Sequence, residues 1–170
     1  MIEFIPTEAG VLTDLCFRTL HGLPADREKL NAVEPDKLFA LAQKHCVASI
    51  VAAAFEKADD FSGSETERWK RAKDHALRRH IILETEKEEV CRGFDRRGIR
   101  YLPLKGNELQ KLYPTGCIRP RSDIDILVEP ENREAIREYL ESIGYTCVKY
   151  DGENHDSYDK EPITHLEIHS

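Results

Sequence analysis

Hydrophobic residues recur at helical spacing through most of the first hundred positions. Thr7 is a good N-cap for the first such segment, and Pro35 is well placed to begin another helix. Residues 48–58 form a further apolar segment. Residues 65–97 contain no proline and mix apolar with charged positions, which predicts one long amphipathic helix. We therefore expect a helical N-terminal region over residues 1–97, roughly a four-helix bundle, with the long helix bridging it to the remainder.

The pattern changes at Gly98, after which short apolar runs alternate with turns. Strands are expected over residues 99–104, 124–128, 145–150 and 163–169, and helices over residues 107–113 and 131–143. The acidic residues 151–162 are expected to form a loop. The resulting fold class is α+β: an N-terminal helical bundle, then a mixed β-sheet of about four strands with flanking helices over residues 98–170. Since the chain stops directly after a strand, we expect this core to be truncated at its C-terminus.

Composition narrows the function classes. The chain has 170 residues, 34% of them charged, and a formal net charge of -7. Proteins that bind extended nucleic acids through phosphates usually carry a basic surface, so such binding is not expected. The N-terminus lacks the features of a signal peptide, and every apolar run is too short to span a membrane. The five cysteines form no CxxC pair. These features are typical of a reduced, cytoplasmic protein without a membrane partner.

Asp123 and Asp125 stand at the beginning of the expected strand over residues 124–128. Because side chains alternate along a strand, both carboxylates point to one face and the neighbouring isoleucines to the other. Two ionised carboxylates side by side repel each other unless a cation lies between them. Mg²⁺ prefers oxygen ligands and keeps positions for phosphate oxygens and water. A DxD pair is common by chance, however, so the hypothesis depends on its context.

Two further segments supply candidates. A glycine turn at Gly106 lets a phosphate approach free backbone N–H groups, and Lys105 adds a positive charge. Glu167 lies on the last expected strand; beside the DxD strand, it can bind a second metal or act as a general base. An ordinary helix turn and an exposed strand glutamate are the alternative interpretations. His165 and His169 share the face of Glu167, and a zinc site built from them is a weaker alternative.

Three stretches taken together are similar to a known family. They are Leu104-Lys105-Gly106, Leu112-Tyr113-Pro114, and the run from Arg119 through Ser122 and Asp125 to Val128. In this order they resemble the uncharacterised nucleotidyltransferase family of the DNA polymerase β superfamily, over residues 99–169. Two positions depart from the pattern. Asn107 stands where the superfamily usually has serine, and Glu167 stands where the family more often has aspartate.

The resemblance implies an enzyme that transfers an NMP from an NTP to a hydroxyl acceptor and releases pyrophosphate. It implies two Mg²⁺ ions as cofactors, with Asp123, Asp125 and Glu167 as the catalytic and metal-binding residues. The nucleotide-binding residues that it implies are Lys105, Gly106, Asn107, Arg119, Arg121 and Ser122. The expected partners are thus an NTP and a hydroxyl acceptor of undefined chemistry.

Other functions remain open at this stage. A non-catalytic nucleotide-binding or protein-interaction module, for example a toxin–antitoxin component, can retain the same fold. A helical adaptor with an incidental DxD pair requires all the motifs to coincide by chance. A phosphatase that forms an aspartyl-phosphate is disfavoured, because it has its DxD after a hydrophobic strand, whereas here the hydrophobic run follows the pair.

Overall fold

The structure is a computed structural model that describes residues 7–57, 64–105, 109–114, 118–150 and 155–170. The chain divides into two compact units. The first unit comprises Met1–Arg78 and Lys111–Pro120, and the second comprises Arg79–Gln110 and Arg121–Ser170. The first is helical, and the second contains a mixed sheet with helices. The predicted α+β class is therefore confirmed.

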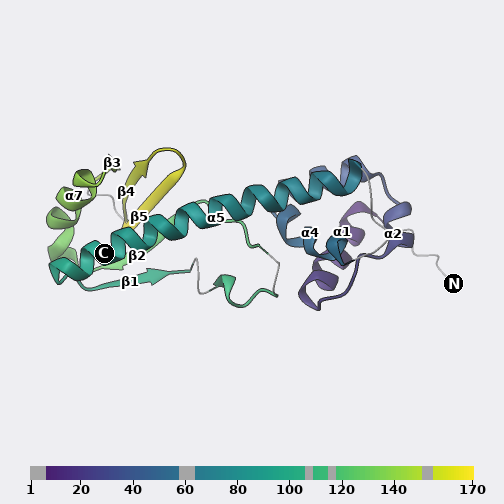
Figure 1. The fold of residues 1–170 in the computed structure, drawn as a ribbon, viewed down its shortest axis with the longest axis horizontal. Coiled ribbons are helices and arrows are strands. Elements are labelled where there is room, and N and C mark those ends of the chain that lie inside the picture. Colours follow the sequence, from purple (N-terminus) through teal and green to yellow (C-terminus); the bar gives the residue numbers. More distant parts are fainter. Residues whose placement is uncertain (1–6, 58–63, 106–108, 115–117, 151–154) are drawn as a thin grey trace. The chain divides into compact units, whose positions relative to one another are not determined.

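The first unit is built from short helices and the beginning of a long one (Figure 1). They are α1 (Glu8–Leu20), α2 (Arg27–Asn31), α3 (Pro35–Lys44), α4 (Ala48–Glu56) and the part of α5 (Ser64–Arg97) up to Arg78. The predicted cap is present, since the Thr7 hydroxyl accepts a hydrogen bond from the Gly10 backbone N–H at 3.2 Å. Pro35 begins α3 as predicted, whereas the short α2 was not foreseen from the sequence.

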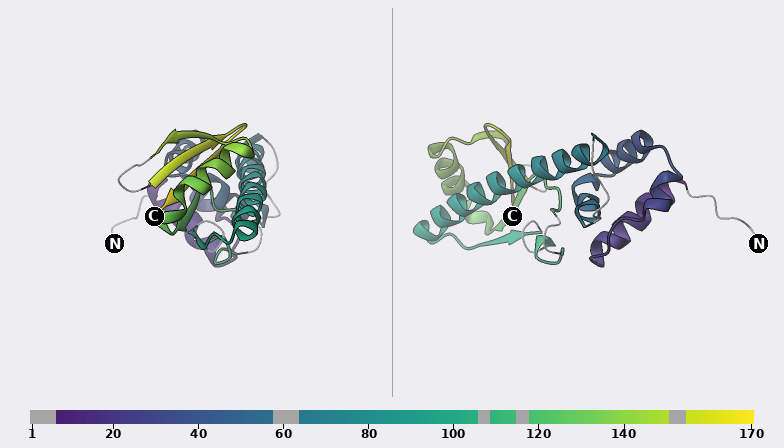
Figure 2. Two further views of the ribbon diagram at one scale, coloured as in Figure 1. Left: turned by 90° about the vertical axis from the view of Figure 1, so that its left-hand side faces the viewer. Right: turned by 45° about the vertical axis from the view of Figure 1, so that its right-hand side comes forward.

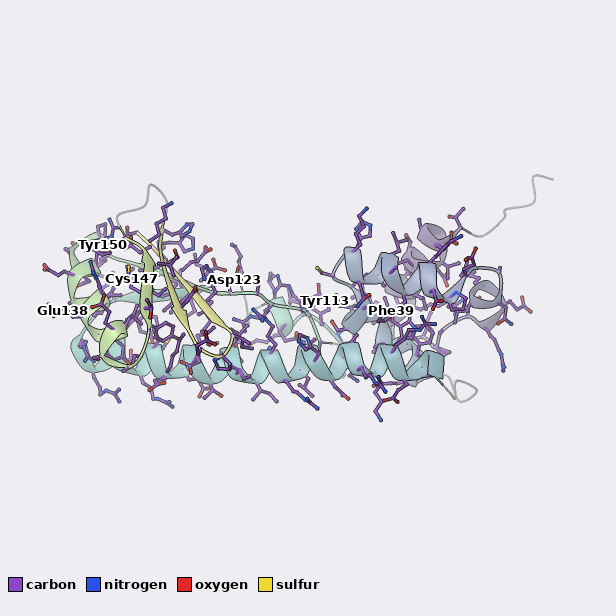
Figure 3. The ribbon with its side chains drawn as sticks, turned by 90° about the horizontal axis from the view of Figure 1, so that it is seen from above. Phe39, Tyr113, Asp123, Glu138, Cys147 and Tyr150 are labelled. Atoms are coloured by element: carbon purple, nitrogen blue, oxygen red, sulfur yellow. The ribbon has the colours of Figure 1, made fainter. Side chains whose placement is uncertain are left out.

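Aromatic side chains organise the core of the first unit. Trp69 of α5 stacks on Phe55 and meets Phe39 edge-on, with ring centroids 4.8 Å apart in both pairs. Phe39 is labelled in Figure 3. Leu15 and Leu38 are fully buried in the same cluster. The apolar periodicity of residues 11–72 therefore serves to build this core.

The second unit contains a five-stranded sheet in the order β1-β2-β5-β4-β3. Its strands are β1 (Tyr101–Leu104), β2 (Ile124–Val128), β3 (Thr146–Lys149), β4 (His155–Lys160) and β5 (Thr164–His169). All neighbouring pairs are antiparallel except β2 and β5, which run parallel. A 3-10 turn (Pro130–Asn132) and α7 (Arg133–Ser142) connect β2 to β3. The parallel pair at the centre of the sheet brings two distant segments together.

The strand β4 corrects the expected loop over residues 151–162. Its sequence, His-Asp-Ser-Tyr-Asp-Lys, is too polar to be recognised as a central strand. Asp156 is nevertheless buried, because the Arg133 guanidinium of α7 binds both of its carboxylate oxygens; one of these hydrogen bonds, from Nε to Oδ2, is 2.9 Å long. A buried carboxylate is tolerated when a paired cation satisfies it. The sheet therefore has five strands rather than about four.

The sheet has one buried face and one open face. Residues in register share a face, and the buried face carries Ile124, Ile126, Leu166, Ile168 and Tyr158. Both α7 and the second part of α5 pack on this side, as the left view of Figure 2 shows. The other face carries Asp125, Glu167 and the histidines of β4 and β5, so the candidate site lies on the side opposite the core.

The two helices on the buried face approach closely at Gly93 of α5. A Cβ at this position would lie 2.0 Å from the Tyr139 ring of α7. The Tyr139 hydroxyl donates a hydrogen bond to the Glu89 carbonyl at 3.0 Å, and the Arg97 guanidinium lies 3.9 Å from the ring centroid. Only a glycine permits this packing, which fixes α5 beneath the sheet.

Candidate functional site

Asp125 and Glu167 lie directly opposite one another on the parallel strands β2 and β5. The alternation of both strands directs their side chains to the open face, while the flanking isoleucines and Leu166 enter the core. Asp125 is 7% exposed and Glu167 is half-buried. The structure thus brings together two of the three carboxylates that the sequence predicted to act jointly.

His169 joins these two carboxylates. Its Nε2 lies 3.1 Å from Asp125 Oδ1 and 3.4 Å from Glu167 Oε2. One ligand atom from each of the three residues lies within 4.8 Å of the others, which is close enough to surround one cation. The sequence predicted that His169 shares a face with Glu167, and the structure confirms it. Its contact with Asp125 depends on the strand pairing, which the sequence did not show.

Two more histidines lie close to the Glu167 carboxylate. His165 Nε2 lies 3.6 Å from Glu167 Oε1, and His155 Nε2 lies 3.7 Å from the same oxygen. The other ring nitrogen of His165, Nδ1, lies 2.5 Å from Asp159 Oδ1. His155 comes from β4, the strand that the sequence did not predict. Imidazoles therefore contact Glu167 on both of its oxygens.

Asp123, labelled in Figure 3, lies immediately before β2 and follows Ser122 in the chain. The Ser122 hydroxyl donates a hydrogen bond to Asp123 Oδ2 at 3.0 Å. Among the described residues, Asp123 is not a member of the three-residue group around His169. The proposed roles of Ser122 and Asp123 remain predictions.

A small hollow of about 70 Å³ adjoins Asp125. It is lined by Lys87, Pro103, Leu104, Lys105, Arg121, Ile124 and Asp125. Lys105 directly follows β1 in a left-handed backbone conformation, with φ of 48°, and its Nζ lies 3.6 Å from Asp125 Oδ1. The hollow thus combines three cationic side chains with the Asp125 carboxylate, and Glu84 pairs with Lys87 and Arg121 beside it. Lys87 was not foreseen, because it comes from the long helix rather than from the motif.

The remaining predicted nucleotide-binding residues are placed differently. Gly106 and Asn107 lie outside the described residues. Arg119 is half-buried and belongs to the first unit. Arg121 is buried and its guanidinium binds the Glu84 carboxylate of α5. Arg121 thus serves packing as well as lining the hollow, and its role toward a nucleotide remains a prediction.

Arg79 of α5 holds the start of both carboxylate-bearing strands. Its guanidinium donates hydrogen bonds to the carbonyls of Arg121 at 2.7 Å, Ser122 at 2.8 Å and Ile163 at 3.5 Å. The first two carbonyls precede β2 and the third precedes β5. In the sequence, Arg79 is one of many charges on a helix. No sequence signal distinguishes it, because its partners are backbone atoms.

Comparisons with known proteins place this geometry in context. The fold is similar to the crystal structure of lincosamide antibiotic adenylyltransferase LnuA with lincomycin bound, at 23% sequence identity and a TM-score of 0.43. The match covers 51% of this chain and 54% of that one, so the present chain spans about half the length of that enzyme. Among curated proteins, none matches this chain. In the part of the chain that the structure describes, no helix is both long and apolar enough to cross a membrane.

The family comparison covers most of the chain. Residues 31–170 match the family described as uncharacterised nucleotidyltransferase. The match includes the DxD pair, the Lys105 turn and the strand that carries Glu167. It confirms the resemblance seen in the motifs, and it begins within the helical region. The chain belongs to the uncharacterised nucleotidyltransferase family.

Proposed function

We propose that this protein is a Mg²⁺-dependent nucleotidyltransferase that moves an NMP from an NTP to a hydroxyl acceptor and releases pyrophosphate. The observation that carries the proposal is the pairing of Asp125 with Glu167 across β2 and β5, beside Lys105. This chemistry needs carboxylates that bind the metal together with a cationic side chain that contacts the phosphates. Membership of a nucleotidyltransferase family supports the proposed reaction class.

The donor atoms fit a divalent cation. Asp125 is buried and lies next to a second carboxylate, an arrangement whose charge repulsion a bound cation relieves. Asp125 and Glu167 would hold the metal, and Asp123 would complete the set from the beginning of the strand. When bound, Mg²⁺ supplies charge neutralisation at the phosphate oxygens. The core-facing isoleucines on either side keep the Asp125 backbone in place.

The cationic hollow is suited to the phosphates of the donor nucleotide. Lys105, which directly follows β1, lines it together with Lys87 and Arg121. Lys87 and Arg121 are both bound to Glu84, which keeps their side chains ordered. The backbone groups of Gly106 and Asn107 would follow Lys105 directly along the chain. The β- and γ-phosphates would thus lie beside Asp125.

The transfer exchanges one phosphorus–oxygen bond for another. The acceptor hydroxyl oxygen attacks the α-phosphorus and forms the new bond, while the bond to the bridging oxygen of pyrophosphate breaks. The hydroxyl proton passes to a base, for which Glu167 Oε1 is the candidate, because the other oxygen, Oε2, lies beside His169 and would hold the metal. Lys105 and Arg121 stabilise the negative charge that develops on the leaving pyrophosphate.

Calorimetric titration of a non-hydrolysable ATP analogue with Mg²⁺ tests the proposal. We would compare the wild type, Asp123→Ala/Asp125→Ala, and Glu138→Ala as a control at an exposed carboxylate of α7. Binding that is lost in the double variant and kept in the control supports a metal–nucleotide site. Circular dichroism spectra would establish that all three proteins are folded.

A catalytic assay then separates the enzyme from a non-catalytic module. The wild type would be incubated with α-labelled NTPs and a panel of hydroxyl compounds, with pyrophosphate release as the readout. Release that requires an acceptor and disappears in Glu167→Gln supports NMP transfer. Nucleotide binding without release by any acceptor would favour the non-catalytic module. Absence of nucleotide binding in a folded wild type would contradict the proposal.

A further inference from the structure

We infer that His169 is a direct metal ligand, so that the site binds a first-row transition dication such as Mn²⁺ more tightly than it binds Mg²⁺. The inference rests on the metal site of the proposed function, to which it adds a nitrogen ligand. It arises from one feature of this chain: an imidazole stands between the two carboxylates on the open face of the sheet.

The distances fit a shared cation. At metal–ligand bonds of about 2.1 Å, adjacent ligands of an octahedral ion lie roughly 3 Å apart, and those of a tetrahedral ion slightly farther. His169 Nε2 lies 3.1 Å from Asp125 Oδ1 and 3.4 Å from Glu167 Oε2. The three ligand atoms lie within 4.8 Å of one another. One cation can therefore contact all three without a rearrangement of the strands.

The strand register fixes His169 in this position. His169 is opposite Leu127 of β2, two pairs beyond the pairing of Asp125 with Glu167. It is two residues from Glu167 on β5, so both side chains leave the sheet on the same face. An imidazole placed in this way by two rigid strands is oriented before any ion binds.

The other two histidines have different positions. His155 and His165 approach Glu167 at Oε1, whereas His169 approaches at Oε2, on the side of Asp125. His165 is also engaged by Asp159. Among the described residues, neither belongs to the group that can surround one cation. His155 and His165 thus orient the Glu167 carboxylate, while His169 completes the ligand set.

Ligand chemistry determines the preferred metal. Mg²⁺ favours oxygen ligands and binds imidazole poorly, whereas affinity for nitrogen rises along the first transition series. A set of two carboxylates and one imidazole leaves positions for phosphate oxygens and water. It is therefore better suited to Mn²⁺, Fe²⁺ or Co²⁺ than to Mg²⁺.

Pulsed electron paramagnetic resonance of bound Mn²⁺ tests the assignment directly, because it detects a coordinated ¹⁴N nucleus. The full 170-residue chain would be loaded with Mn²⁺ alone as wild type, as His169→Gln, and as His155→Gln. His155 is a matched control, since its ring centroid lies 5.4 Å from that of His169 on the same face. Calorimetric titrations of the same proteins with Mn²⁺ and with Mg²⁺ would give the affinities.

We expect a ¹⁴N coupling in the wild type and in His155→Gln that is absent in His169→Gln. We also expect His169→Gln to weaken Mn²⁺ binding by about tenfold or more and Mg²⁺ binding by less than about threefold. Mn²⁺ bound without a ¹⁴N coupling, or a coupling that persists in His169→Gln, would overturn the role of His169. The proposed function would survive that result if Asp125→Asn still abolished binding. Absence of any Mn²⁺ or Mg²⁺ binding in the folded wild type would refute both.

Discussion

The Glu84 carboxylate of α5 binds the Arg121 guanidinium, whose side chain is only 3% exposed. Arg121 contacts one carboxylate oxygen of Glu84, and Lys87 Nζ contacts the other at 2.8 Å. Burial acts to raise the pKa of Glu84, but the hydrogen bonds from Lys87 and Arg121 outweigh it, so this pKa is lowered. The segment that leads into the DxD strand is thereby attached to the long helix.

We predict that Glu84→Gln destabilises the protein by about 2 kcal/mol or more, because it leaves a buried guanidinium without its charged partner. Urea unfolding would measure the difference. The control is Glu88→Gln on the same helix, whose exposed ion pair with Arg92 is 3.9 Å long. We expect the control to change stability by less than about 0.5 kcal/mol. Equal effects of the two variants would contradict the structural role of Glu84.

The same ion pair predicts a dependence of stability on acidity. The folded-state pKa of Glu84 lies below its ordinary value of 4.5. The stabilisation is therefore complete above pH 4.5 and is lost as the pH falls through the lowered pKa. We expect the stability gap between wild type and Glu84→Gln to narrow as the pH falls below about 4.5.

Unfolding curves at a series of pH values would measure this gap. His80 also titrates near Glu84 and Arg121: burial lowers the pKa of His80, so protonation below pH 6.5 works against the folded state in both proteins. The Glu84 charge raises the pKa of His80, so the penalty is larger in Glu84→Gln and the gap widens while His80 titrates. A gap that fails to narrow below about pH 4.5 would refute the prediction.

We predict that Arg79→Lys weakens nucleotide-analogue binding as well as stability. A lysine retains the charge but lacks the planar guanidinium, which donates hydrogen bonds to three backbone carbonyls that precede β2 and β5. We expect a loss of about 1–3 kcal/mol in unfolding free energy. Calorimetry at a temperature where the variant is fully folded would give the affinity. Arg78→Lys, at the exposed neighbouring position, should change neither quantity.

We predict that Lys105→Met lowers the affinity for the ATP analogue by about tenfold, since one charged contact to phosphate is worth roughly 1–2 kcal/mol. The loss should shrink as salt is added, because Lys105 is exposed and its charge is screened. Titrations at two ionic strengths would measure it, with Lys70→Met as the control at an exposed position. A loss that is independent of salt would indicate that the substitution acts by changing the left-handed backbone at residue 105, not by removing a charge that contacts phosphate.

Alternation of apolar and polar residues was sufficient to predict the faces of the two key strands. In β2 the isoleucines are buried, and in β5 Leu166 and Ile168 are buried while Glu167 faces outward, as the sequence indicated. The hydrophobic effect acts position by position, so this pattern can be seen in the sequence itself. The fold class and the outward carboxylates were therefore predictable.

Features that depend on partners far along the chain were not predictable. The strand β4 places Asp156 on the buried face, which is tolerated only because Arg133 of α7 pairs with it. Arg79 donates hydrogen bonds to backbone carbonyls, and contacts with backbone atoms cannot be recognised from the residue types in the sequence. The ion pair of Arg121 with Glu84 in the core of the second unit could not be predicted from the sequence either. In each case a tertiary contact outweighs local preference.

The parallel pairing of β2 with β5 has a consequence for the newly made protein. Asp125 of β2 and His169 of β5 are 44 positions apart in the chain. During synthesis the DxD segment leaves the ribosome well before Glu167 and His169 do. A partly made or proteolytically shortened chain therefore carries the DxD pair without its partners. The proposed site can therefore assemble only when β5 has paired with β2.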